Sequence, residues 1–216
     1  MKINLILIGA CVALASCGPL NGGNVPLGLV ASVIPTELGN DSPVEQPAPR
    51  LTRAFVESQP TDLLRVSIIA REATALVIPA GTNGTKTTWF SEDGLSVTFD
   101  QGVLIGTRGL GDDLMGANVS GTISSLRTGG NYLKTMQFLD GLDQIETQTF
   151  ECIAVPIRTE TITIIERDQA ATVTEETCSG SEQLFKNTYW TGPDGVVWQA
   201  RQWVSPDVGY LGYQRL

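Results

Sequence analysis

The chain has 216 residues, with 14 Lys and Arg against 23 Asp and Glu, and a formal net charge of −9 at pH 7. Because nucleic-acid-binding proteins neutralise phosphates with basic side chains, this balance excludes a nucleic-acid partner. The sequence has no histidine, which removes Ser-His-Asp and Cys-His catalysis, histidine-ligated zinc and an imidazole base. We expect no metal and no cofactor.

The first 17 residues have the layout of a bacterial lipoprotein signal peptide. Lys2 gives a positively charged start, and an apolar run over 3–13 follows that is too short to span a bilayer. Small residues then precede Cys17, which we expect to carry diacylglycerol and a further acyl chain such as palmitate, enough for stable anchoring. Gly18 favours sorting to the outer membrane. The alternative is an ordinary secretory peptide that happens to contain this cysteine.

The mature chain divides into a tether and one domain. Residues 17–50 carry the lipid and are rich in Pro, Gly, Asn and Ser, so we expect an irregular, flexible tether. Its apolar run over 27–35 could instead dock on the domain as an extra strand. Residues 51–216 are long enough for a single packed domain. An acidic domain would repel an acidic polysaccharide unless local arginines overrule the average.

The domain begins with a short helix, expected over 51–58, and then has the alternation and turn signals of β-structure. Residues 109–118 resemble a loop with at most one helical turn, and 132–142 could be helical on apolar spacing alone. We expect an all-β fold, an antiparallel meander that is barrel-like. Its expected strands are 63–69, 74–80, 85–90, 95–99, 103–107, 131–139, 145–156, 160–167, 171–178, 183–190 and 196–204.

Two cysteines remain in the domain, Cys152 and Cys178, both in expected strands. Disulfides form and persist in exported proteins, so we expect these two residues to be bonded to each other. The alternative is a pair of buried free thiols.

Glycoside hydrolysis needs only two carboxylates, so the lack of histidine does not exclude it. Nearly all of the candidate carboxylates stand beside glycines at turns, where Asp bonds its own backbone. We therefore favour a structural role, predict no catalytic residue, and expect that the protein is not an enzyme. The candidate pairs are Glu92 and Asp93, Asp112 and Asp113, and Asp140 and Asp143.

Residues 189–206 hold three of the four tryptophans. In a strand, Trp198 faces one way, and Gln199, Arg201 and Trp203 face the other. We expect Trp198 in the core, and Arg201 and Trp203 on an exposed face, in cation–π contact, with Gln199 beside them. That face would contact a glycan or a protein partner. The alternative is that Trp203 also belongs to the core.

The spacing W-x-x-x-D-G-apolar occurs twice, at 89–95 and 190–196. Each copy predicts a strand ending in tryptophan, an Asp-Gly turn and a new strand. We favour two similar hairpins over a duplicated half. In both copies the tryptophan, Trp89 and Trp190, is expected in the core.

Three stretches carry a family resemblance: WFSEDGLSVTFDQGVLIGTRGLGDDL, the cysteine pair TFEC and ETC, and NTYWTGPDGVVWQARQWVSPDVGYLGYQRL. Over residues 51–216 the chain resembles the YjbF/GfcB family of outer-membrane lipoproteins, found with exopolysaccharide and group 4 capsule genes. The resemblance implies an all-β fold and a non-enzymatic part in polysaccharide assembly or export beside an outer-membrane β-barrel protein. It implies no catalytic residues.

With the signal peptide, the resemblance places the domain on a lipid anchor at the outer membrane, facing the periplasm. Two alternatives stay open. One is a periplasmic carboxylate-dependent enzyme that modifies glycans. The other is a purely structural lipoprotein that binds a barrel protein and no sugar.

Overall fold

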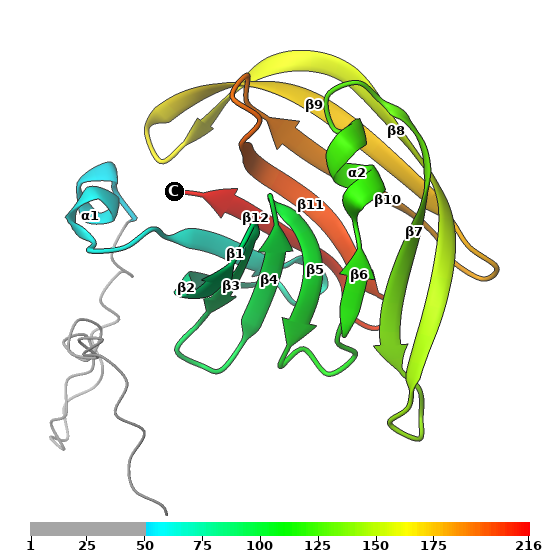
Figure 1. The fold of residues 1–216 in the computed structure, drawn as a ribbon. Coiled ribbons are helices and arrows are strands. Elements are labelled where there is room, and N and C mark those ends of the chain that lie inside the picture. The colour runs from blue at the N-terminus through cyan, green and yellow to red at the C-terminus, as the bar shows by residue number, and fades with distance from the viewer. Residues whose placement is uncertain (1–50) are drawn as a thin grey trace, which may run out of the picture. The chain divides into compact units, whose positions relative to one another are not determined.

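The structure is a computed structural model that describes residues 51–216. The expected signal peptide, Cys17 and the tether lie outside the described residues. The described part is almost entirely antiparallel β-structure in one 12-stranded sheet, with two short α-helices and one 3-10 turn (Figure 1). The expected all-β, barrel-like meander is confirmed.

Short strands joined mostly by tight turns follow one another along the chain, interrupted by only a few helical turns. In chain order the elements are α1 (Arg53–Ser58), β1 (Leu64–Ile68), η2 (Ile69–Arg71), β2 (Ala73–Asn83), β3 (Lys86–Phe90), β4 (Ser96–Asp100), β5 (Val103–Arg108), β6 (Gly116–Asn118), α2 (Ser120–Ser125), β7 (Gly130–Leu139), β8 (Ile145–Ile164), β9 (Arg167–Ser179), β10 (Leu184–Thr191), β11 (Val197–Ser205) and β12 (Gly209–Arg215).

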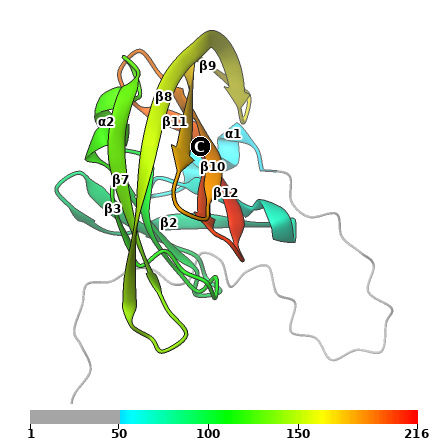
Figure 2. The same cartoon turned by 90° about the vertical axis from the view of Figure 1, so that its right-hand side faces the viewer.

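The sheet consists of two meanders joined through its first and last strands. The strand order is β5-β4-β3-β2-β1-β12-β11-β10-β9-β8-β7-β6, and β1 pairs with β12 from Leu64 opposite Arg215 to Ile68 opposite Leu211. The two edge strands are therefore β5 and β6, which follow each other in the chain. The strongly curved sheet brings these edges side by side and nearly closes a barrel (Figures 1 and 2).

Alternating side chains fill the interior of this barrel. On β4, Val97 and Phe99 are buried and their neighbours are half-buried, which is the period-two pattern of a strand with one buried face. The hairpin expected over 95–107 is confirmed by the pairing of β4 with β5. Residues 131–139 form β7, so the helical alternative for this segment is wrong.

The strands β6, at the end of the loop expected over 109–118, and β12 were not expected, and one expected boundary is wrong. The strands expected at 145–156 and 160–167 are one strand of 20 residues, β8. The register against β9 shifts between Pro156 and Arg158, because proline cannot donate to the ladder and a bulge lets the strand continue past it. The helix α2 was not expected, because its sequence SGTISS has no apolar periodicity.

The two W-x-x-x-D-G stretches form hairpins with the same turn. Gly94 and Gly195 have φ values of 90° and 88°, a conformation that glycine adopts without steric cost. In each turn this glycine N–H donates to the carbonyl three residues earlier, at 3.2 Å and 3.0 Å. The hairpins are β3–β4 and β10–β11, which supports the interpretation as two similar hairpins.

The helix α1 confirms the element expected over 51–58 and is tied to a distant turn. The Arg53 guanidinium donates to the carbonyls of Ile164 at 2.7 Å and Ile165 at 3.0 Å, where β8 turns into β9. Glu57 forms an ion pair with Arg167 at 3.0 Å. Because these contacts join residues more than 100 positions apart, they fix the start of the domain to the far end of its longest hairpin.

Cys152 and Cys178 lie directly opposite each other on β8 and β9. Both are buried, their Cα atoms are 4.1 Å apart, and the structure joins them by a disulfide. The bond closes a loop with a sequence separation of 26 residues. It therefore links two neighbouring strands that also share backbone hydrogen bonds.

Reducing this disulfide should destabilise the domain, because the cross-link limits the freedom of the unfolded chain. The chain-entropy relation gives about 3 kcal/mol for a loop of this size, which corresponds to a drop in melting temperature of several degrees. The measurement is thermal unfolding with and without reductant, with thiol alkylation followed by mass. The double variant Cys152→Ala/Cys178→Ala should melt at one temperature in both conditions. Two thiols that react fully in native, unreduced protein would contradict the pairing.

Candidate functional site

The tryptophan-rich stretch does not form the expected exposed face. Trp203 is 7% exposed, and its ring stacks on Phe185 with centroids 4.4 Å apart and meets the edges of Phe138 and Phe150. The guanidinium of Arg201 lies over the ring of Tyr210 instead, 3.3 Å from its centroid. The expectation that Arg201 and Trp203 share an exposed face is therefore wrong.

The reason lies in the pairing of β11. Its register against β10 reaches Arg201 and stops, and the Trp203 N–H donates instead to the Asn187 side chain at 2.7 Å. A further register shift against β12 lies between Trp203 and Ser205. Past Arg201 the period-two alternation fails, and four successive residues from Gln202 to Ser205 are buried.

The other tryptophans divide between core and surface. Trp89 is buried, as expected. Trp190 is half-buried and donates from its indole nitrogen to Glu160 at 2.6 Å. Trp198, expected in the core, is half-buried and lies against Gly192, where an added Cβ would come within 2.7 Å of the indole nitrogen. Gln199 is half-buried and accepts a hydrogen bond from Gln214.

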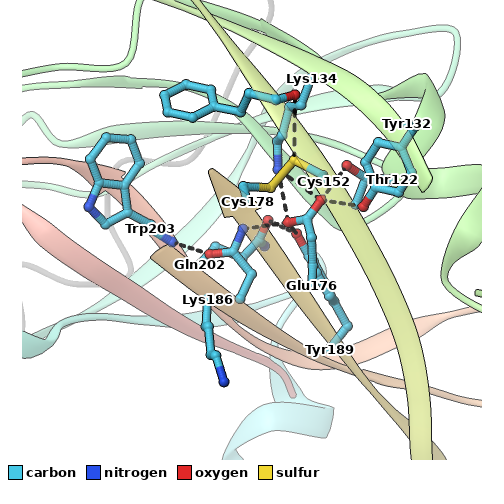
Figure 3. The surroundings of a disulfide bond; sticks show 12 residues. Thr122, Tyr132, Lys134, Cys152, Glu176, Cys178, Lys186, Tyr189, Gln202 and Trp203 are labelled. Carbon is cyan, nitrogen blue, oxygen red and sulfur yellow. Dashed lines mark hydrogen bonds and ion pairs between the residues drawn. A yellow bond between two sulfur atoms is a disulfide. The ribbon is translucent and has the colours of Figure 1, made fainter. Parts of the chain in front are cut away.

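The best-connected polar group in the domain is the carboxylate of Glu176 on β9, which is 0% exposed inside the barrel (Figure 3). Its neighbours come from α2, β7 and β10, and each donates a hydrogen bond to one or both carboxylate oxygens. They are Thr122 at 2.7 Å, Tyr132 at 2.6 Å, Lys134 at 3.0 Å, Asn187 at 2.5 Å and Tyr189 at 3.1 Å.

The electrostatics of this cluster keep Glu176 ionised. Burial alone would raise the pKa of its carboxyl, but the Lys134 charge and the donated hydrogen bonds outweigh burial and lower the pKa to about 2. Burial, and then the nearby Glu176 charge, raise the pKa values of the Tyr132 and Tyr189 hydroxyls. Both tyrosines therefore stay protonated and act as donors.

The cluster continues across the barrel to the opposite edge of the sheet. The Tyr189 hydroxyl also lies 3.3 Å from the Gln202 side-chain oxygen. That oxygen accepts from the Leu104 N–H of β5 at 2.8 Å, and the Gln202 amide donates to the Gly102 carbonyl at 3.0 Å. Polar contacts thus lead from α2 and β7 near one sheet edge to β5 at the other, with the single Tyr189 hydrogen shared between Glu176 and the Gln202 oxygen.

This cluster was not expected from the sequence, although a signal for it exists. Glu176 shares the inward face of β9 with the buried Cys178, and Lys134 shares the inward face of β7 with the buried Met136. A charged residue in the apolar register of a strand indicates a buried pair. The Cys152 and Cys178 sulfurs lie beside the carboxylate, but they are bonded to each other. They are not thiolate ligands for a metal.

The expected carboxylate pairs support loops and turns. Four of the six carboxylates accept hydrogen bonds from backbone N–H groups or hydroxyls, which is the structural role favoured for them, and Glu92 and Asp143 have no such contact among the described residues. The contacts are those of Asp93 with Ser91, Asp113 with Thr107, Gly109 and Leu110, Asp140 with Leu142 and Gln144, and Asp112 with Asp207.

A groove of about 600 Å³ lies where the two sheet edges meet. We call it the seam groove. Most of its lining side chains carry hydroxyls or amides, and its one charged residue is Arg108. It is lined by Thr88, Ser96, Thr98, Ile105, Gly106, Thr107, Arg108, Met115, Gly116, Ala117, Asn118, Thr135 and Gln137.

A smaller hollow of about 330 Å³ lies beside the β4–β5 and β10–β11 turns. Trp89, Phe99 and Tyr213 contribute aromatic rings to its lining, and Asp194 and Arg215 contribute charge. Neither hollow is lined by two carboxylates, which carboxylate-dependent glycoside hydrolysis requires.

Comparison with known proteins adds a family and a fold. The family model described as group 4 capsule polysaccharide lipoprotein gfcB, YjbF matches residues 29–216. The family resemblance was expected to begin at residue 51, but the match begins 22 residues earlier. Part of the expected tether therefore belongs to the family pattern. No curated protein sequence matches the chain.

A solved structure shares the fold. It is the crystal structure of the hypothetical lipoprotein YmcC from Escherichia coli (K12), with 17% sequence identity and a TM-score of 0.67. The alignment covers 76% of this chain and 87% of that one. Within residues 51–216, no helix has both the length and the apolar composition needed to cross a membrane.

Truncating the two tryptophans of β11 should have unequal effects on stability. Trp203→Ala should cost about 3–5 kcal/mol, because it removes a buried ring from an aromatic cluster and leaves a cavity. Trp198→Ala should cost less, because that ring is half-buried. Urea unfolding of both variants gives the two free energies. An equal or larger loss in Trp198→Ala would contradict the observed burial.

Replacing Glu176 should change both stability and its pH dependence. Because the folded pKa of about 2 lies below the usual value, this group stabilises the fold above about pH 4.5, and the contribution is lost as pH falls toward 2. Glu176→Gln should cost about 3–5 kcal/mol at pH 7, since it leaves the Lys134 charge buried and unpaired. Its stability should fall less steeply than that of the wild type between pH 5 and 2.

The matched control for this experiment is a double-mutant cycle with Lys134→Met. The double variant should lose less free energy than the two single losses added together, because neither charge is then left alone. Denaturant unfolding at several pH values measures all four proteins. Additive losses would show that the two charges do not interact.

Proposed function

The chain belongs to the family of group 4 capsule polysaccharide lipoproteins, and from this membership we propose that it is a non-enzymatic outer-membrane lipoprotein that supports the assembly or export of an exopolysaccharide or capsule. The family match over residues 29–216 is the observation that carries the proposal. The shared fold with a lipoprotein structure agrees with it.

The proposed location rests on the N-terminal sequence. Cys17 follows an apolar run and small residues, as in a lipoprotein signal, and Gly18 favours the outer membrane. The lipid would hold the domain at the membrane surface, facing the periplasm, on a tether of some 30 residues. An outer-membrane β-barrel export protein is the partner that this arrangement suits.

The absence of catalysis is supported by how the carboxylates are used. Glu176 is sealed in the interior with every nearby donor bound to it, so it has no access to a substrate. Four of the six turn carboxylates already accept hydrogen bonds. A periplasmic glycan-modifying enzyme is the alternative, and it would need two carboxylates in one accessible hollow.

Deleting the gene in the native bacterium and restoring it tests the proposal. The deletion should reduce the polysaccharide at the cell surface, and the wild-type gene should restore it. Cys17→Ser should fail to restore it and should not incorporate labelled fatty acid, because no thiol is left to carry the lipid. Cys11→Ser, a cysteine inside the expected signal peptide, is the matched control and should behave like the wild type.

The measurements are surface polysaccharide per cell, fatty-acid labelling, and the distribution of the protein between inner and outer membrane fractions. Unchanged surface polysaccharide in the deletion strain would contradict a role in assembly or export. A further variant of the full-length protein replaces every surface carboxylate near the two hollows. If this variant still restores export fully, the result argues against the enzyme alternative.

A further inference from the structure

We infer that the seam groove binds a negatively charged stretch of polysaccharide, with Arg108 contacting the sugar acid groups. This inference rests on the proposed function and names the ligand and the site through which it would act. It is carried by three features of the groove: its place at the junction of the sheet edges, its hydroxyl and amide lining, and its charge.

The groove exists because the barrel closes without a full strand pair at the seam. Between β5 and the segment before β6, one backbone hydrogen bond crosses, from the Thr107 N–H to the Leu114 carbonyl at 2.9 Å. The Arg108 guanidinium donates across the same gap to Leu114 at 3.1 Å and Met115 at 3.4 Å. These contacts hold the two edges together at one point, and the groove lies beside it.

Two glycines line the groove, one from each side of the seam. Gly106 and Gly116 belong to its lining. A Cβ at Gly106 would meet nothing closer than the Leu114 carbonyl at 3.6 Å, whereas one at Gly116 would come within 2.9 Å of the Gln137 amide oxygen. A side chain at position 116 would therefore displace Gln137, whereas Gly106 is buried and a methyl group would fit there.

The lining suits a ligand rich in hydroxyl groups. Thr98 and Thr135 stand on opposite walls of the groove, on β4 and β7, and Asn118 and Gln137 add amides. Hydroxyls and amides both donate and accept hydrogen bonds, which matches the alternating donors and acceptors of a sugar chain. The volume of about 600 Å³ falls in the range of binding pockets for small ligands.

The charge of the groove selects for an anion. The protein carries 23 acidic residues against 14 basic ones, yet the groove is lined by one arginine and no carboxylate. A guanidinium has five donors in a planar fork that matches a carboxylate. Three of the Arg108 N–H groups bind the carbonyls of Thr107, Leu114 and Met115. The side chain is exposed, so the remaining two N–H groups can face a ligand. The local charge of the groove is therefore positive, although the net charge of the protein is negative.

The test measures binding of the full-length lipidated protein, in detergent, to polysaccharide purified from the producing bacterium. The probes are the native polymer and the same polymer after chemical reduction of its carboxyl groups. The wild type should bind the native polymer, with affinity falling as salt rises, and should bind the reduced polymer at least tenfold more weakly. Arg108→Gln should lose about the same factor for the native polymer and nothing for the reduced one.

Two control pairs separate binding from folding. Arg127→Gln removes another exposed arginine outside the groove and should bind like the wild type. Because Arg108 also holds the seam, Thr135→Trp serves as a second variant that fills the groove and leaves the arginine in place. It should abolish binding, whereas Thr161→Trp, an exposed residue on β8, should not. Melting temperature is measured for all four.

The outcomes separate this inference from the proposed function. Equal binding of native and reduced polymer, or unchanged binding by folded Thr135→Trp, would overturn the groove as an anionic glycan site. If the deletion strain loses surface polysaccharide while the wild-type protein binds neither polymer, the inference fails and the proposed function stands. Binding that follows the expected pattern in a strain that exports normally without the gene would support the site and remove the function.

Discussion

The fold depends on one ionised carboxylate held inside the barrel. Glu176 is inaccessible to water, and such a charge is tolerated only when it is paired and fully hydrogen-bonded. Lys134 supplies the opposite charge, and hydroxyls and an amide from α2, β7 and β10 supply the remaining bonds. Each of these elements must adopt its observed position for the carboxylate to be satisfied, so the cluster selects one arrangement of the sheet.

The same cluster explains how a sheet with two free edges behaves as a barrel. Through Tyr189 and Gln202 its polar contacts reach the backbone of β5, while Tyr132 and Lys134 stand on β7, beside the other edge strand. The edges are thus connected across the interior. Direct pairing at the seam is correspondingly slight, and a polar groove remains on the outside where a closed barrel would have a continuous ladder.

The filled interior of the barrel limits where the protein can contact a ligand. The interior is filled by the aromatic cluster around Trp203, the disulfide and the Glu176 network, which leaves the outer surface as the place for the proposed glycan contact. Free strand edges invite unwanted pairing with other chains. At the seam Arg108 occupies carbonyls, which keeps those groups from a foreign strand and places one positive charge beside the groove.

The sequence by itself determined the local features. Alternation and Asp-Gly turns placed ten of the twelve strands, all but β6 and β12, together with the two hairpins and the helix at 51–58, because these signals depend on neighbouring residues. Only the tertiary structure decided which tryptophan is buried. Trp203 points inward because β11 leaves β10 after Arg201, and a break in pairing depends on a partner strand that spacing within one strand does not show. The Glu176 cluster and the seam groove likewise join residues far apart in the chain, and only the closure of the sheet brings them together.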